Sequence, residues 1–122
     1  MQKILVVEDE MAYSKLLSSQ LTKNGYQVIV AENGEQGLEK AKNEKPDLIL
    51  LDIKMPVMDG LGMLNLLRKE EFGKKTKVIM LTNIDPDPKV IGEMVADRPV
   101  YYFVKSDINF KSLLDKISEV LK

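Results

Sequence analysis

The feature that most constrains the fold of this chain is an unbroken apolar run at residues 48–51, which ends on a carboxylate, Asp52. Turn-forming residues follow it, namely Pro56 and the pair Asp59-Gly60. A short apolar run bounded by turn residues is typical of a strand that is buried on both faces, as in parallel α/β sheets. Because ligands of such sheets bind beyond the carboxyl ends of the strands, Asp52 is the first candidate functional residue.

Apolar runs of this kind occur five times, and helical patterns separate them. The runs predict strands at residues 4–7, 28–31, 47–51, 78–81 and 100–104. The patterns between and after them predict helices at about residues 11–24, 34–45, 60–72, 88–97 and 110–121. The alternation predicts an α/β fold, a doubly wound (βα)5 arrangement whose five-stranded parallel sheet has helices on both faces. Residues 1–122 are expected to form a single domain.

Two of the expected helices each offer four apolar residues to a core. The first carries a stripe of four, at Ala12, Leu16, Leu17 and Leu21. The fourth also has only four to bury, at Val90, Ile91, Met94 and Val95. Asn33 and Asp59 stand where their side chains can cap the second and third helices, and the last helix is clearly amphipathic.

Composition excludes several kinds of chemistry. Cysteine and histidine are both absent, so disulfides, thiolate sites, thiol nucleophiles and imidazole ligands or bases are excluded. The chain has 18 basic and 19 acidic residues, and its net charge of −1 gives no reason to expect direct binding to nucleic acid or an anionic membrane. With no apolar run near the roughly 20 residues of a membrane span and no secretory signal pattern, the protein is expected to be cytoplasmic.

Polar side chains stand at the carboxyl ends of four of the five expected strands. Glu8 and Asp9 follow the first strand, Asp52 the third, Thr82 the fourth and Lys105 the fifth. Each has an ordinary explanation by itself: acids complement a helix dipole, Asp and Thr form turns and local hydrogen bonds, and a loop lysine is solvated. Because parallel strands end at one edge of the sheet, their coincidence there favours a common site.

The chemistry open to such a site is narrow. Clustered carboxylates repel one another unless a proton or a cation neutralises them. Oxygen ligands without His or Cys favour a hard cation, and Mg²⁺ held by Asp9 and Asp52 leaves coordination places for phosphoryl oxygens. We therefore hypothesise that Asp52 attacks phosphorus, that Mg²⁺ and Lys105 neutralise the developing charge, and that Thr82 donates a hydrogen bond.

These motifs resemble the receiver domain of bacterial two-component response regulators (CheY-like), and the resemblance covers nearly the whole chain. The matching segments are ILVVEDE at 4–10, PDLILLD at 46–52, MPVMDG at 55–60, LT at 81–82 and VK at 104–105. The resemblance implies a flavodoxin-like fold with strand order 2-1-3-4-5. It also implies that Asp52 is the phosphoacceptor, that Asp9 is a Mg²⁺ ligand, that Glu8 is a ligand through water, and that the backbone carbonyl of Lys54 completes the protein's share of the metal shell.

By the same resemblance, Thr82 and Lys105 contact the phosphoryl group and Tyr102 is the switch aromatic. In the family, the residue that matches Thr82 moves toward the phosphate and the aromatic turns inward. A half-buried strand aromatic explains Tyr102 equally well.

Several positions depart from the family pattern. Ser106 stands where proline is common, after a peptide bond that is typically cis in the family. Asn83 stands where a small residue is usual, and Asn83, Ile84 and Ser106 are possible modulators of the site. Arg98-Pro99 replaces the Gly-Ala that commonly precedes the fifth strand.

The leading hypothesis is a phosphorylatable receiver that takes a phosphoryl group from a sensor histidine kinase or a histidine phosphotransfer protein. It would be a signalling domain that catalyses its own phosphoryl uptake and loss, not an enzyme in the usual sense. Unless the sequence is a piece of a longer chain, output is expected through binding of a downstream protein target, as a monomer or a phosphorylation-dependent dimer.

Two alternatives belong to other functional classes. A pseudo-receiver, a phosphorylation-independent interaction module, would be indicated by loss of Asp9, Asp52, Thr82 or Lys105. None of these is lost, but Asn83 and Ser106 keep the alternative open. A phosphatase of the haloacid dehalogenase type would have a second Asp two residues after the nucleophile, and Lys54 occupies that place.

Overall fold

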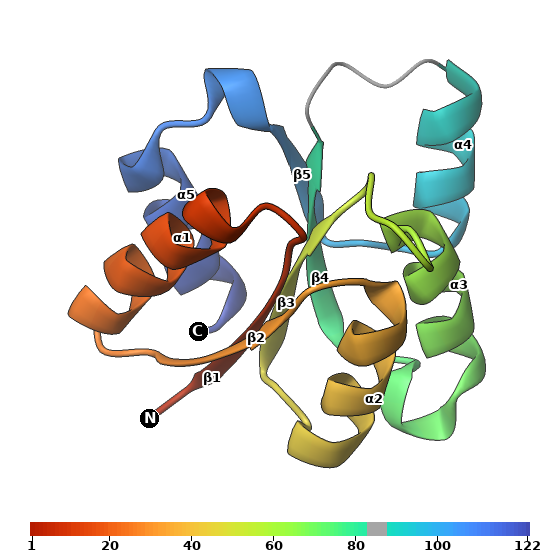
Figure 1. Ribbon diagram of the computed structural model, residues 1–122, viewed down its shortest axis with the longest axis horizontal. Coiled ribbons are helices and arrows are strands. Elements are labelled where there is room, and N and C mark those ends of the chain that lie inside the picture. Colours follow the sequence, from red (N-terminus) through yellow and green to blue (C-terminus); the bar gives the residue numbers. More distant parts are fainter. Residues whose placement is uncertain (83–87) are drawn as a thin grey trace.

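A single sheet of five parallel strands runs through the centre of the molecule in the order β2-β1-β3-β4-β5 (Figure 1). The computed structural model describes residues 1–82 and 88–122, apart from the side chain of Asp107. The strands are β1 (Lys3–Val7), β2 (Gln27–Ala31), β3 (Leu48–Asp52), β4 (Lys77–Thr82) and β5 (Tyr101–Val104). The predicted (βα)5 fold and its strand order are therefore confirmed.

The helices cover both faces of the sheet, as predicted. They are α1 (Met11–Lys23), α2 (Gly34–Glu44), α3 (Gly60–Lys69), α4 (Pro88–Ala96) and α5 (Phe110–Val120), with short 3-10 turns η1 (Glu71–Gly73) and η2 (Lys105–Asp107). Figure 1 shows α1 and α5 on one side of the sheet and α2, α3 and α4 on the other. None of the helices that the structure describes has the length and apolar character that crossing a membrane requires.

Side chains of the central strands alternate between two cores. In β1, Ile4 and Val6 point to one core, which they share with residues of α1 and α5. Leu5 and Val7 point to the other core, which they share with residues of α2, α3 and α4. Every residue of β3 is buried, because the strand has β1 and β4 beside it and helices on both faces. This double burial explains why its sequence is a continuous apolar run.

The helix termini use the predicted caps. The Asn33 side chain accepts a hydrogen bond from the N–H of Gln36, and that of Asp59 accepts one from Gly62 at 2.8 Å. After α1, Gly25 has a φ of +89°, which a side chain would disfavour. These caps fix where the loops at the carboxyl edge of the sheet begin and end.

Three predictions about helices were wrong in detail. In α1, Ala12 and Leu16 are exposed, because the buried side of the helix runs through Ser14, Leu17 and Leu21 instead. In α4, Val95 is 63 % exposed, and Met94 alone is fully buried. The helix predicted to reach about residue 72 ends at Lys69, and the chain then tightens into η1.

Candidate functional site

The site lies at the carboxyl edge of the sheet, where Asp52 ends β3. Asp52 is paired in register with Leu81 of β4, and only 2 % of its surface is exposed. The following loop folds back at once: the N–H of Gly60 donates to the carbonyl of Ile53 at 2.7 Å. A Cβ at position 60 would collide with the backbone oxygen of Asp52, so the tight return of the chain requires glycine.

A sharp turn shapes the loop between β3 and α3. The N–H of Met58 donates to the carbonyl of Pro56 at 2.7 Å, and Val57 between them has a φ of +68°. Such γ-type turns are rare for a residue with a side chain. The carbonyl of Met58 accepts from Gly34 at 2.9 Å, which ties the loop to the start of α2. Lys54, the predicted carbonyl ligand, lies exposed in this loop.

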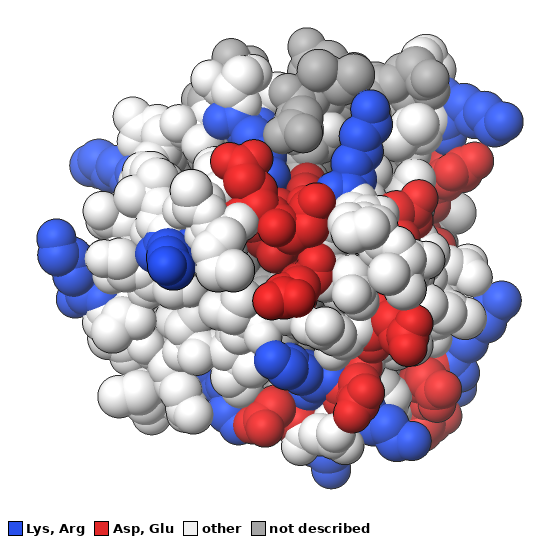
Figure 2. Space-filling model, in the orientation of Figure 1, with Lys and Arg blue, Asp and Glu red and all other residues white. Residues whose placement is uncertain are grey.

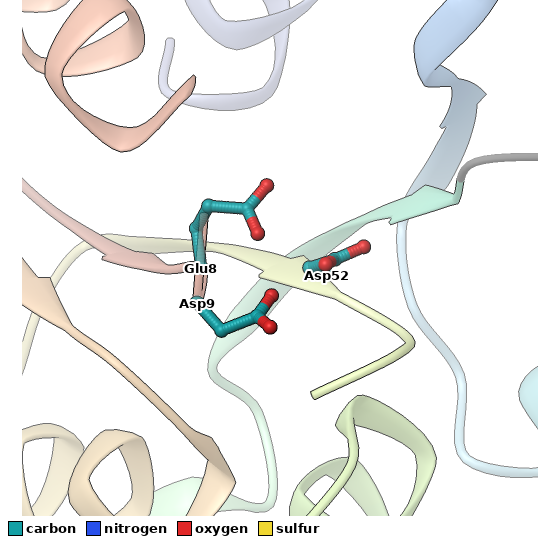
Figure 3. Close-up of side chains that lie close together, drawn as sticks. All are labelled: Glu8, Asp9 and Asp52. Carbon is teal, nitrogen blue, oxygen red and sulfur yellow. The ribbon is translucent and has the colours of Figure 1, made fainter. Parts of the chain in front are cut away.

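Three carboxylates come together at this edge. One oxygen each of Glu8, Asp9 and Asp52 lies within 4.8 Å of the others. Figure 3 shows the first two projecting from the end of β1 toward Asp52 at the end of β3. In Figure 2 acidic side chains gather near the top of the visible face, over the part where the strands end in Figure 1. Glu8 and Asp52 are buried, and Asp9 is exposed.

The donor set of this cluster fits a hard divalent cation. All its side-chain donors are carboxylate oxygens, the type that Mg²⁺ and Ca²⁺ prefer. Oδ1 of Asp52 is buried and has no hydrogen-bond partner among the residues that the structure describes. Because a buried acceptor without a partner is costly, this oxygen is well suited to meet a cation.

Lys105 supplies the positive charge at the cluster. Its Nζ donates a hydrogen bond to Glu8 and lies 3.4 Å from Oδ2 of Asp52. The Lys105 side chain is only 8 % exposed. Water therefore screens its charge little, and the ammonium acts on both carboxylates at close range.

Burial and close charges shift the pKa values of Glu8, Asp52 and Lys105. Burial raises the pKa of Glu8 to about 7, and the negative charge of Asp52 pushes it in the same direction. Burial also raises the pKa of Asp52, and the charge of Lys105 opposes this rise. For Lys105, burial lowers the pKa, but its hydrogen bond to Glu8 and the charge of Asp52 outweigh burial and the net shift is upward.

The remaining predicted residues lie around this cluster or outside the described part of the chain. Thr82 is buried at the end of β4, one residue beyond the partner of Asp52. Tyr102 lies on β5 opposite Met80 and is 39 % exposed. Ser106 is exposed beside Lys105, and the peptide bond between them is trans, since the described chain contains no cis bond. The candidate modulators at positions 83 and 84 lie outside the described residues.

One residue of the site was missed by the sequence analysis. The ring of Tyr13 lies beneath the Lys105 ammonium, with Nζ 4.5 Å from the ring centroid. Tyr13 lies in the first turn of α1, four residues after Asp9 along the chain. That spacing was the only signal in the sequence, and it does not say which lysine the ring would meet.

Comparisons with known proteins show the family that the chain resembles. Residues 4–118 match the response regulator receiver domain family. The chain is 44 % identical over 98 residues to the alkaline phosphatase synthesis transcriptional regulatory protein PhoP of Bacillus subtilis (strain 168). This match covers 79 % of the chain and 40 % of PhoP. The chain spans less than half the length of PhoP and of several, but not all, of the other curated relatives that it matches.

Solved structures give the same result for the fold. Chemotaxis protein CheY4 of Vibrio cholerae superposes with a TM-score of 0.90 at 32 % identity, over 99 % of both chains. The response regulator TrrA of Thermotoga maritima, solved in complex with Mg²⁺-BeF, has a TM-score of 0.85 at 36 % identity. That match covers 99 % of this chain and all of TrrA.

Proposed function

This chain belongs to the response regulator receiver domain family of two-component systems, and on that premise we propose that it signals by accepting a phosphoryl group on Asp52 with Mg²⁺. The observation that carries the proposal is the surroundings of Asp52. This buried carboxylate lies beside two further acids and a buried ammonium 3.4 Å away, and one of its oxygens has no hydrogen-bond partner in the part of the chain that the structure describes. The Mg²⁺-BeF complex of the similar protein TrrA supports the choice of metal.

The acidic cluster holds the cation in this proposal. Asp9 and Asp52 would hold it directly and Glu8 through water, and the backbone carbonyl of Lys54 would complete the protein's share. When bound, Mg²⁺ neutralises the clustered carboxylates and the oxygens of the incoming phosphoryl group.

The chain's own residues carry the transfer. An oxygen of Asp52 forms a bond to phosphorus as the bond from phosphorus to the donor's leaving atom breaks, and the leaving atom keeps the electron pair of that bond. The nitrogen of a phosphohistidine donor then holds a proton taken from water. Lys105 neutralises charge on the phosphoryl oxygens, and Thr82 donates a hydrogen bond to one of them. A sensor histidine kinase or phosphotransfer protein supplies the group, since this chain contains no histidine.

Output follows from rearrangement around Thr82 and Tyr102. Tyr102 is 39 % exposed, so an inward turn of its ring on phosphorylation would change the surface that β5 offers to a downstream protein target. The position of Tyr102 on the edge strand supports this role, because an edge strand has a neighbour on one side only.

The proposed function is tested by intact mass after incubation with Mg²⁺ and acetyl phosphate. We expect the parent protein to gain one phosphoryl group, a chelator to abolish the gain, and Asp52→Asn to show none. Asp59→Asn is the matched control: it changes another acid of the same loop, and asparagine retains its helix cap. No gain in the folded parent, or equal gain in Asp52→Asn, would contradict the proposal and favour a phosphorylation-independent interaction module.

Mg²⁺ should stabilise the protein more at pH 8 than at pH 5.5. The pKa of Glu8 is about 7 in the folded protein against 4.5 ordinarily, so the folded state holds the extra proton. Without metal, this shift of Glu8 alone should therefore lower stability by roughly 3 kcal/mol as pH rises from about 4.5 through about 7. Mg²⁺ binds the ionised cluster and should offset this loss at pH 8, whereas at pH 5.5 it must displace a proton.

Thermal unfolding followed by circular dichroism measures this difference. Glu8→Gln should flatten the pH dependence of the metal-free protein, because the glutamine cannot ionise. An equal Mg²⁺ effect at both pH values, in the parent protein, would show that the cluster is not the binding site.

A further inference from the structure

We propose that Tyr13 is a positioning residue that holds the Lys105 ammonium beside Asp52 through the face of its aromatic ring. The inference deepens the proposed phosphoryl transfer and rests on it. In this role Tyr13 contacts neither Asp52 nor the phosphoryl group, and it acts only through Lys105.

The contact has the geometry of a cation–π interaction. Nζ of Lys105 lies 4.5 Å from the centroid of the Tyr13 ring, well inside the roughly 6 Å over which such contacts act. Because the lysine side chain is 8 % exposed, little water competes for the ammonium. The attraction is stronger at desolvated sites of this kind than at the surface.

The ring itself is held in place by packing. Tyr13 is partly buried against the core between the sheet, α1 and α5, together with Phe103, Ile108 and Phe110. Packing against this core restricts the ring, so its face stays turned to the ammonium. Its hydroxyl oxygen is buried and has no hydrogen-bond partner within residues 1–82 and 88–122. Tyr13 therefore contacts Lys105 through its aromatic face and not through its hydroxyl.

The site needs such a neutral contact for its lysine. The ammonium otherwise bonds to Glu8, which also belongs to the candidate metal cluster. A carboxylate that also binds a metal cannot hold the Lys105 ammonium in one place at all times. The Tyr13 ring competes for neither the cation nor the phosphoryl group, so it can keep the ammonium near Asp52 whatever Glu8 binds.

The chain contains a matched control for this contact. Lys116 lies over the ring of Tyr101, 4.4 Å from its centroid, on the outer part of β5 and α5. This second ring–lysine pair does not involve the acidic cluster. Tyr101→Leu therefore removes a ring–lysine contact of similar distance without touching the site.

The test compares rates of phosphoryl uptake from acetyl phosphate with Mg²⁺. Tyr13→Leu, which keeps an apolar filler but no ring, should slow uptake roughly tenfold at saturating acetyl phosphate. Tyr13→Phe, which keeps the ring and loses the unpartnered hydroxyl, should stay within about twofold of the parent, as should Tyr101→Leu. Uptake by Tyr13→Leu at the parent rate, or by Tyr13→Phe as slow as Tyr13→Leu, overturns the proposal.

A second measurement needs neither metal nor phosphodonor. Protons above an aromatic ring resonate upfield, so the Lys105 Hε signals of the parent should be shifted upfield in NMR spectra and should return toward ordinary values in Tyr13→Leu. An unshifted signal in the parent overturns the contact even if that variant does not fold. A parent that shows the shift but takes up no phosphoryl group contradicts the proposed function and leaves the ring–ammonium contact standing.

Discussion

Replacing Lys105 with methionine is expected to slow phosphoryl uptake by Asp52 roughly 100-fold. The ammonium lies 3.4 Å from Oδ2 of Asp52 and is almost fully shielded from water, so its charge acts on the reacting oxygens with little screening. Methionine has a similar length and no charge, so the change removes chiefly the electrostatic contribution. The rate is measured as the time course of intact mass with Mg²⁺ and acetyl phosphate.

Lys116→Met is the matched control for this prediction. Lys116 also lies over a tyrosine ring and pairs with an acid, Glu119 at 3.3 Å, but it is 27 % exposed on α5. We expect its uptake rate to match that of the parent. If Lys105→Met reacts at the parent rate, or if both variants slow equally, the charge of Lys105 has no special role in the transfer.

The same substitution should reduce stability at pH 8 without metal. Removing the ammonium leaves Glu8 and Asp52 buried together with no opposite charge, which is strongly unfavourable for ionised groups. The kinetic comparison is therefore made at a temperature at which circular dichroism shows both proteins folded. Mg²⁺ should recover much of the lost stability, because it supplies the missing positive charge.

The fold was predictable because its strands and helices carry different apolar patterns. A strand buried on both faces, such as β3, must be apolar throughout, and no other common element of that length looks the same. Helix faces were less predictable. Leu16 and Leu17 are both apolar, yet only Leu17 is buried, since neighbouring positions on a helix point about 100° apart and the sheet selects one of them.

The membership of the site was predictable for a topological reason. Parallel strands end at one edge, so Asp9, Asp52 and Lys105 had to lie near one another once the alternation was recognised. Which side chains make contact was not predictable in the same way. The pairing of Lys105 with Glu8 and with the ring of Tyr13 depends on side-chain reach and packing across about 90 residues of chain, and no local pattern encodes it.

Arg68 is the clearest structural residue that the sequence did not reveal. Its guanidinium donates to four backbone carbonyls: those of Gly73 and Thr76 at 2.7 Å, Asp97 at 2.8 Å and Arg98 at 3.0 Å. These carbonyls belong to two segments, the approach to β4 and the turn between α4 and β5. Arg68 therefore joins three parts of the chain from its position on α3.

The contact with the second segment explains how an unusual turn is stabilised. Arg98 has a φ of +55°, a left-handed conformation that costs a residue with a side chain about 1 kcal/mol or more. The sequence marked this place, because Arg98-Pro99 stands where the family commonly has Gly-Ala. Arg68 binds the carbonyls of Asp97 and Arg98, which precede and follow the Cα of Arg98, and so offsets the strain of that turn.

Arg68→Ala should lower the free energy of unfolding by about 3 kcal/mol, since it leaves partly buried carbonyls without their charged donor. Arg68→Lys should recover less than half of this loss, because an ammonium cannot span carbonyls that the planar guanidinium reaches on several sides. Lys69→Ala, at the next and exposed position of α3, should change stability by less than about 0.5 kcal/mol.

Urea unfolding followed by circular dichroism at equilibrium distinguishes these outcomes. If Arg68→Lys were as stable as the parent, positive charge alone would explain the effect and the four-way geometry would be irrelevant. If Arg68→Ala lost less than about 1 kcal/mol, the carbonyls would be satisfied by water and the turn at Arg98 would need another source of stability. Because Arg68 lies away from the acidic cluster, folded Arg68→Ala should still take up phosphoryl at the parent rate, which separates its role in the fold from the chemistry of Asp52.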